Sequence, residues 1–234
     1  MNLESCSLLE RLFCNNNSLI RLATNQCTSL KELECTNNQL EELILPNNSL
    51  LWRLNCTNNN LSSLNVSSYS KLVDLKVGVN NLSSLDISHC PELSIISIAN
   101  TNISFLDCKQ CSKLSSVSCD ESEIETLDLS NCTELSFLGI RNTKNLNQLL
   151  LANSPITGIN AEGSMVLHEI PDWFPTNNPD FQFFYEHRYN YTDKYQTDSN
   201  NNKLRIVEDK GYGWWYPDEP GNCIIVPAGN STDQ

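Results

Sequence analysis

Apolar residues recur at fixed short spacings along the first two thirds of the chain. In the stretch LKELECTNNQLEELIL, residues 30–45, they stand three residues apart, then two apart, and the same order follows in the second half of the stretch. Spacings of three and two within one segment fit neither an amphipathic helix nor a simply alternating strand. The local pattern therefore leaves the element undecided, and a longer period has to decide it.

The longer period is 21 residues. It runs from Cys6 to about Asn153 in seven copies, with one residue inserted near Lys144. One column of the repeat holds Leu9, Leu30, Leu51, Leu72, Leu93, Leu114 and Leu135. Regular self-similarity of this length is the sequence signature of a solenoid, in which each repeat packs only against its neighbours.

Each copy contains two half-units, and each half-unit ends on two apolar residues that are two apart, such as Leu33 and Cys35. In an extended segment such a pair shares one face, so it points inward while the residues flanking it point outward. Residues 45–51 leave no room for a helix of useful length. We therefore expect a mainly β solenoid with two parallel sheets.

These residues resemble the leucine-rich repeat family, whose pattern is LxxLxLxxN/CxL; LKELECTNNQL, residues 30–40, matches it at each position. The resemblance covers residues 6–159. The 21-residue length, with cysteine in the strand, is similar to the short type found in surface and secreted proteins of gut bacteria. It implies a leucine-rich-repeat solenoid of about seven coils over residues 1–159, which presents a binding face.

Composition changes where the repeats end. Ten of the eleven cysteines precede residue 154, whereas 13 of the 18 aromatic residues follow residue 160. We therefore expect a second unit, residues 160–234, forming an aromatic-rich cap or small β domain. Its stretches FQFFYEHRYNYTDKY and KLRIVEDKGYGWWYP are typical of strands, and QTDSNNN between them of a loop.

The repeat gives its cysteines and asparagines structural roles. Val77, Ile98 and Ile140 share a column with Cys35, so the position favours a medium apolar volume, which a reduced cysteine supplies. Disulfides between stacked pairs such as Cys6 and Cys27 are the alternative. The asparagines at the first turn are expected to satisfy backbone groups of their own turn and of the next coil, in a column of Asn17, Asn38, Asn59 and Asn80.

The outward positions of the first sheet are the main candidate surface. Arg11, Glu32, Arg53 and Asp74 alternate in sign along one column, which predicts stabilising cross-strand pairs. The functional alternative makes this face a docking surface for a protein or glycan. Its candidate ligand-binding residues are Phe13, Trp52, Arg53, Lys76 and Phe137.

Two further polar patterns favour structural roles. Asn65, Asp86, Asp107 and Asp128 form a column in the second half-units, mostly followed by serine two residues on. Cation binding is one reading, but turn capping through the backbone is the more usual role of such residues. The acidic run DESEIE, residues 120–125, is expected to be a solvated turn.

The carboxyl-terminal aromatics have two interpretations. Trp214, Trp215 and Tyr216 are candidate ligand-binding residues if they form a platform on which a sugar ring stacks. The alternative is that they form the core of a small domain that is poor in aliphatic residues.

Charge and length exclude several functions. The net charge of −13 disfavours nucleic acid as a partner, and no apolar run is long enough to cross a membrane. The first residues, MNLESCSLLERLF, lack the basic start and apolar stretch of a signal peptide.

The chain shows no HExxH, GxSxG or phosphate-loop motif, so we predict no catalytic residue, no metal and no cofactor. The prediction is a non-enzymatic module that recognises a protein or glycan outside the cell or at a bacterial cell surface. Alternatives are a cytoplasmic adaptor, or a carbohydrate-binding or enzymatic unit in residues 160–234 with the repeats as its scaffold.

Overall fold

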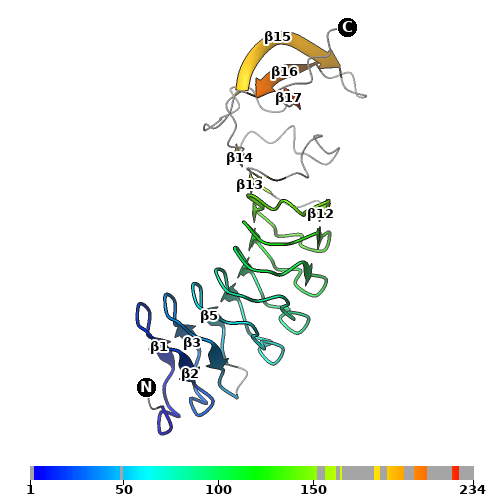
Figure 1. Ribbon diagram of the computed structural model, residues 1–234. Coiled ribbons are helices and arrows are strands. Elements are labelled where there is room, and N and C mark those ends of the chain that lie inside the picture. The colour runs from blue at the N-terminus through cyan, green and yellow to red at the C-terminus, as the bar shows by residue number, and fades with distance from the viewer. Residues whose placement is uncertain are drawn as a thin grey trace.

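The computed structural model describes residues 3–47, 50–151, 156–161, 164, 182–184, 189–197, 203–209 and 223–226. In residues 3–47 and 50–151 the chain winds into stacked coils, each crossing the molecule twice in short extended segments joined by turns (Figure 1). The described residues contain no helix. The predicted β solenoid of about seven coils is therefore confirmed.

One side of the coils forms a parallel sheet of nine strands, here called the first sheet. Equivalent residues of successive coils pair directly, for example Leu12 with Leu33 and Leu33 with Leu54, as the 21-residue period predicts. In order, the strands are β1 (Arg11–Phe13), β3 (Glu32–Glu34), β5 (Arg53–Asn55), β6 (Asp74–Lys76), β7 (Ile95–Ser97), β9 (Ser116–Ser118), β11 (Phe137–Gly139), β13 (Gly158–Asn160) and β14 (Gln182–Phe184).

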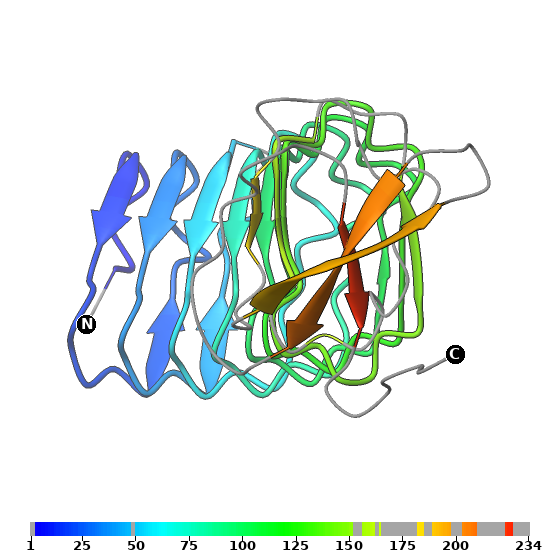
Figure 2. The same ribbon diagram turned by 90° about the horizontal axis from the view of Figure 1, so that it is seen from above.

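The other side of the coils, the second side, does not form the single continuous sheet that the repeat suggested. It holds a pair, β2 (Arg21–Ala23) with β4 (Glu42–Ile44), and a trio, β8 (Phe105–Asp107), β10 (Thr126–Leu129) and β12 (Gln148–Leu151). Figure 2 shows β2 and β4 as a row separate from the strands of the first sheet.

The gap in the second side falls in the third and fourth coils, where residues 61–66 and 82–87 are described but form no strand. Both segments carry a serine pair, Ser62 with Ser63 and Ser83 with Ser84. Serine offers the backbone competing hydrogen bonds and has little side chain to pack on a pleated surface. The prediction of a second sheet is therefore right only for the coils on either side of this gap.

The carboxyl-terminal strands form a separate small sheet. β15 (Tyr189–Thr197) pairs antiparallel with β16 (Lys203–Asp209), and β16 pairs parallel with β17 (Cys223–Val226). Two of these strands lie in the stretches for which strands were predicted. The aromatic cap itself and the boundary near residue 160 remain predictions.

The core is a set of columns that run through the solenoid. The leucine column of the first half-units is fully buried from Leu30 to Leu135, with no exposed side-chain surface. Burying one leucine contributes about 1.5–3 kcal/mol. In the first coil the equivalent residues Leu9 and Leu12 are only partly buried, because a coil at the end has a neighbour on one side only.

Cysteines occupy this core as small apolar side chains. Cys35, Cys56, Cys108 and Cys119 are buried free thiols. Burial raises the pKa of both Cys56 and Cys119 to about 12, so these thiols stay protonated at neutral pH. Packing by reduced thiols, the favoured interpretation, is confirmed for these positions.

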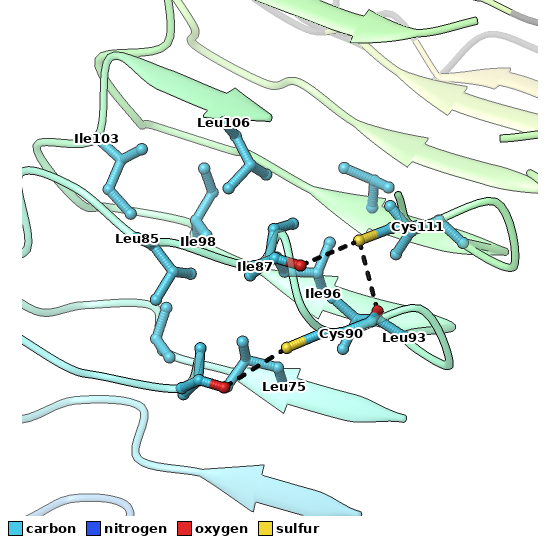
Figure 3. Close-up of a cluster of buried hydrophobic side chains, with 14 of the residues drawn as sticks. Leu75, Leu85, Ile87, Cys90, Leu93, Ile96, Ile98, Ile103, Leu106 and Cys111 are labelled. Atoms are coloured by element: carbon cyan, nitrogen blue, oxygen red, sulfur yellow. Dashed lines mark hydrogen bonds between the residues drawn. The ribbon is translucent and has the colours of Figure 1, made fainter. Parts of the chain in front are cut away.

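A second column of thiols binds backbone oxygens of neighbouring coils. Cys90 Sγ lies 3.6 Å from Val66 O, and Cys111 Sγ lies 3.5 Å from Cys90 O. Figure 3 shows these thiols beside the aliphatic core, which includes Leu75, Leu85, Ile87, Ile96, Ile98 and Leu106. The column thus combines apolar packing with weak hydrogen bonds.

The asparagine column joins neighbouring coils at the first turn. The amide nitrogen of Asn59 donates to Cys56 O at 2.9 Å in its own coil and to Cys35 O at 3.0 Å in the preceding coil. Its oxygen accepts from the Leu40 backbone N–H of the preceding coil at 3.0 Å. The structural role is confirmed, but the partners lie in the preceding coil rather than in the next one.

The residue directly before each position of the asparagine column has a left-handed backbone. Asn16, Asn37 and Asn58 have φ of 56°, 53° and 58°, and the turn is continued by Val79, Asn100, Glu121 and Asn142. Asparagine tolerates this region well, whereas a β-branched residue is strained there. Val79, with φ 53° and a 41% exposed side chain, is therefore the strained member.

We expect Asn59→Leu to lower the free energy of unfolding by about 1–3 kcal/mol, because it leaves Leu40 N–H and two buried carbonyls without their partner. Urea denaturation of the intact chain measures the change. Asn60→Leu is the matched control, because Asn60 is exposed. Equal effects of the two variants would contradict the role of the column.

The cysteine column predicts that Cys56→Val changes stability by less than about 1.5 kcal/mol, because the same column already holds Val77 and the volumes are similar. Cys56→Ser should cost about 1–3 kcal/mol, since it buries a hydroxyl in an apolar site. Thermal denaturation of both variants gives the comparison. If serine were tolerated better than valine, the apolar reading would be wrong.

Relief of the strained turn should stabilise the chain. Val79→Asn is expected to raise the free energy of unfolding by about 1 kcal/mol, because asparagine enters the left-handed region at lower cost. The reciprocal variant, Asn58→Val, should lower stability by a similar amount, and it also removes the 2.9 Å bond from Asn58 Nδ2 to Asn37 Oδ1. Urea midpoints that move in the opposite senses would contradict this account.

Candidate functional site

The outward face of the first sheet carries the predicted column of alternating charge. Paired strands place Arg11 opposite Glu32, Glu32 opposite Arg53, and Arg53 opposite Asp74. Arg11 Nε lies 3.0 Å from Glu32 Oε1. The cross-strand pairing that the sequence predicted is therefore confirmed.

Arg53 is the centre of this ion-pair network. Its Nη2 lies 2.9 Å from Glu34 Oε1 on one neighbouring strand, and its Nε lies 3.3 Å from Asp74 Oδ2 on the other. Lys76 Nζ lies 3.8 Å from the same Asp74 oxygen. Arg53 Nε and Asp74 Oδ1 have no aligned hydrogen-bond partner, so the Arg53–Asp74 contact is an ion pair rather than a directed hydrogen bond.

The network is partly sheltered from water. The side chain of Asp74 is 12% exposed and that of Arg53 is 32% exposed. Trp52 stands directly before Arg53, and 37% of its surface remains exposed. The Trp52 carbonyl accepts from Val73 N and Asp74 N, so the backbone of this tryptophan is fixed to the next strand.

The structure brings together three of the predicted ligand-binding residues and separates the others. Trp52, Arg53 and Lys76 lie on adjoining strands β5 and β6 or directly before them. Phe13, 55% exposed, lies two strands away on β1, about 10 Å at the usual strand spacing. Phe137, 37% exposed, lies four strands away on β11, about 19 Å at that spacing.

Trp214, Trp215 and Tyr216 lie outside the described residues. Their role as a sugar platform, and the alternative of a ligand-binding or enzymatic unit in residues 160–234, stay predictions.

The acidic column of the second side caps turns. Asp86 Oδ1 accepts from Ser88 N at 3.0 Å and from Ser88 Oγ at 2.7 Å, and Asp128 makes the same pair of bonds with Ser130. Hydrogen bonds from the serine hydroxyls lower the pKa of both aspartates. Turn capping, the favoured interpretation, is confirmed, and the described residues contain no group of three or more side chains able to hold a metal ion.

The acidic run 120–125 is only in part the solvated turn that was expected. Asp120 is half-buried, and its Oδ1 accepts from Arg141 N at 2.8 Å. Burial raises the pKa of this carboxyl group. Gly139 makes room for it, since a Cβ there would lie 2.9 Å from Asp120 Oδ1. The neighbouring Glu121 stays at the surface and pairs with Arg141 at 3.0 Å.

Sequence reasoning missed an exposed aromatic residue on the second side. Phe105 is 61% exposed on β8, and Leu150 is 43% exposed on β12. Both line a surface cavity with Asp107 and Asp128. The signal was present, because the outward column of the second half-units reads Arg21, Glu42, Ser63, Ser84, Phe105, Thr126, and the phenyl ring is its one large apolar member.

The described residues offer surfaces for contact, and their buried thiols are protonated. The buried cysteines have raised pKa values, so they are poor nucleophiles at neutral pH. The exposed groups are aromatic rings, ion-paired side chains and capped carboxylates on a rigid set of strands. Such an array suits binding. No helix among the described residues is long and apolar enough to span a membrane.

Comparisons with known proteins agree with this architecture. No protein family model matches the chain, and no curated protein matches it either. Among solved structures, the leucine-rich effector protein YopM from Yersinia pestis matches with 27% identity and a TM-score of 0.63, over 71% of this chain and 46% of YopM. The Leptospira interrogans leucine-rich repeat protein LIC12759 matches with 22% identity and a TM-score of 0.53, over 66% of this chain and 49% of that one.

The functional domain of InlJ from Listeria monocytogenes, which includes a cysteine ladder, aligns with 18% identity over 79% of this chain and 55% of that one. Its TM-score of 0.42 is too low to add to the fold assignment. The chain spans about half the length of these solved proteins. The 21-residue period, the in-register parallel strands and the architecture shared with YopM and LIC12759 lead to one conclusion: the chain has the leucine-rich-repeat fold, built from short 21-residue coils.

Proposed function

We propose that the protein is a non-enzymatic recognition module that binds a protein or glycan through the first-sheet face around Trp52 and Arg53. The observation that carries the proposal is the ordered neighbourhood of these two side chains. Tryptophan and arginine are the residue types most enriched among binding hot spots. Here they are adjacent, and both are accessible at the surface.

The ion pairs hold this surface in shape before a partner arrives. Arg53 contacts Glu34 and Asp74 on two different strands, and Lys76 contacts the same Asp74. Fixing long side chains on binding costs about 0.5–1.5 kcal/mol for each. A network that already restrains Arg53 and Lys76 reduces that cost and leaves more of the interaction energy for affinity.

The spread of the other exposed rings favours a large ligand. Phe13 and Phe137 lie on the same sheet as Trp52, to either side of it along the solenoid. A partner that reached all three rings would span about 29 Å at the usual strand spacing, which a folded protein or a long glycan can do. A small molecule would contact only one of them.

We place this recognition outside the cell that makes the protein, either at a bacterial cell surface or after secretion. Two kinds of observation support the placement. The short repeat with cysteine in the strand resembles that of surface and secreted bacterial proteins, and YopM, a structural neighbour, is an effector protein. Residues 160–234 would then be a separate unit that follows the binding solenoid.

The test is binding of the intact chain to arrays of host matrix proteins and glycans. For a ligand found there, Trp52→Ala should weaken affinity about tenfold or more, the loss of about 1.4 kcal/mol. Arg53→Lys keeps the charge but loses the two-sided contact, so it should weaken affinity as well. Ile20→Ala is the control, because Ile20 is 58% exposed outside this face.

Thermal denaturation of Trp52→Ala and Ile20→Ala should show little change, since these side chains are exposed. Affinity that is unchanged by Trp52→Ala, or lowered equally by Ile20→Ala, would contradict the proposal. So would the absence of any binder on both arrays.

A further inference from the structure

A small cavity of about 190 Å³ opens on the second side of the coils, on strands other than those of the Trp52 face. It lies over β8, β10 and β12, and its lining includes Phe105, Asp107, Lys109, Asp128, Gln148 and Leu150. Figure 1 shows β12 and β13 on opposite sides of the coil stack, so the cavity faces away from the first sheet.

The cavity follows from side-chain size along two columns. Thr126 lies between Phe105 and Gln148 in one column, and Asp128 lies between Asp107 and Leu150 in the other. The small threonine on the middle strand leaves a hollow between larger side chains on the outer strands. Phe105 and Leu150, 61% and 43% exposed, form its apolar rims at diagonal corners.

The two carboxylates in the cavity are held in place by their own turns. Asp107 Oδ1 accepts from Lys109 N at 3.1 Å. Asp128 Oδ1 accepts from Ser130 N at 3.0 Å and from Ser130 Oγ at 2.6 Å. Within the described part of the chain, neither Oδ2 atom takes part in a hydrogen bond. Each carboxylate therefore offers a fixed acceptor to a ligand.

Donors stand beside these acceptors. Lys109 and Gln148 also line the cavity, and neither side chain forms a hydrogen bond among the described residues. The Ser130 hydroxyl and, more weakly, the charge of Lys109 lower the pKa of Asp128, so this carboxylate is ionised at neutral pH. The site thus combines an exposed phenyl ring with mixed donors and acceptors.

This combination fits a sugar ring better than an ion. Sugar hydroxyls both donate and accept hydrogen bonds, and the C–H face of a pyranose packs on an aromatic ring. Two carboxylates disfavour an anion, and Lys109 opposes a cation. At about 190 Å³ the cavity is small, so it suits one ring of a ligand and not several.

We propose that this cavity binds one ring of a neutral oligosaccharide, with Phe105 against its apolar face and Asp107, Asp128, Lys109 and Gln148 bonded to its hydroxyls. The site is separate from the Trp52 face and does not depend on it. A single shallow site of this kind gives weak binding, with affinity gained when several sugar rings or several copies engage together.

The experiment is calorimetric titration of the intact chain with four neutral probes: cellotetraose, chitotetraose, maltotetraose and xylotetraose. We expect saturable binding of at least one probe. Phe105→Ala should weaken it about tenfold or more by removing the stacking surface, the loss of about 1.4 kcal/mol. Since Phe105 is mostly exposed, the variant should keep its thermal midpoint.

A matched pair of variants tests the carboxylate. Asp128→Asn should weaken binding several-fold, whereas Asp86→Asn, in the same column but outside the cavity, should leave it unchanged. Both variants keep the turn, because Asn65 already makes the equivalent bonds to Ser67 through its side-chain oxygen. Equal losses of affinity in the two variants would show that binding depends on the negative charge of the chain and not on a site at the cavity.

Four other results would overturn the proposal: no saturable binding of any of the four probes, binding unchanged by Phe105→Ala, binding abolished by Trp52→Ala, or tighter binding of tetralysine that Asp128→Asn removes. The third result would move the sugar to the first-sheet face, and the fourth would make the cavity a cation site. Failure of the array experiment with Trp52→Ala leaves this cavity unaffected, so the two proposals fail separately.

Discussion

The structure depends on hydrogen bonding between equivalent positions of successive coils. No coil can pair its own strands internally, because its two extended segments lie on opposite sides of the core. The backbone groups of the strands are therefore satisfied by the coil before or after, while the turns also form bonds within their own coil, such as Cys90 N to Ile87 O. The amide of Asn59 does the same at the turn, where it joins Cys56 O of its own coil to Cys35 O and Leu40 N of the preceding one. The inward positions therefore repeat from coil to coil with residues of similar size and polarity, such as Cys56, Val77 and Ile98 in one column.

That constraint leaves only the outward positions free to vary. Their side chains differ between the first strands of the first sheet and the later ones. From β1 to β6 the first sheet carries the ion pairs centred on Arg53. From β7 to β11 the outward residues carry no charge, and three of the six are serine. Directly before β11, the Ser136 hydroxyl donates to Ser115 O of the preceding coil at 2.9 Å. The charged side chains of the first sheet are thus concentrated at one end of a regular scaffold.

Much of the fold could be predicted because the period determines the register. Once Leu33 and Leu54 are assigned to one column, their pairing and burial follow, as do the pairs between Arg11 and Glu32 and between Arg53 and Asp74. The residues that broke the repeat were harder to predict. Val79 replaces asparagine at a left-handed turn, and Asp120 turns inward over Gly139, because both depend on the local backbone rather than on the spacing of apolar residues.

The second side was harder to predict for a related reason. Its half-units keep their inward leucines in every coil, so the pattern gives equal support for a strand everywhere. Whether a strand forms depends on the outward residues, where Ser63 and Ser84 offer little to pack, while Phe105, Thr126 and Gln148 sit in a paired trio. The same outward residues create the cavity beside Phe105. A column of inward residues specifies the solenoid, and the exceptions along the outward columns give its surface the features on which both binding proposals rest.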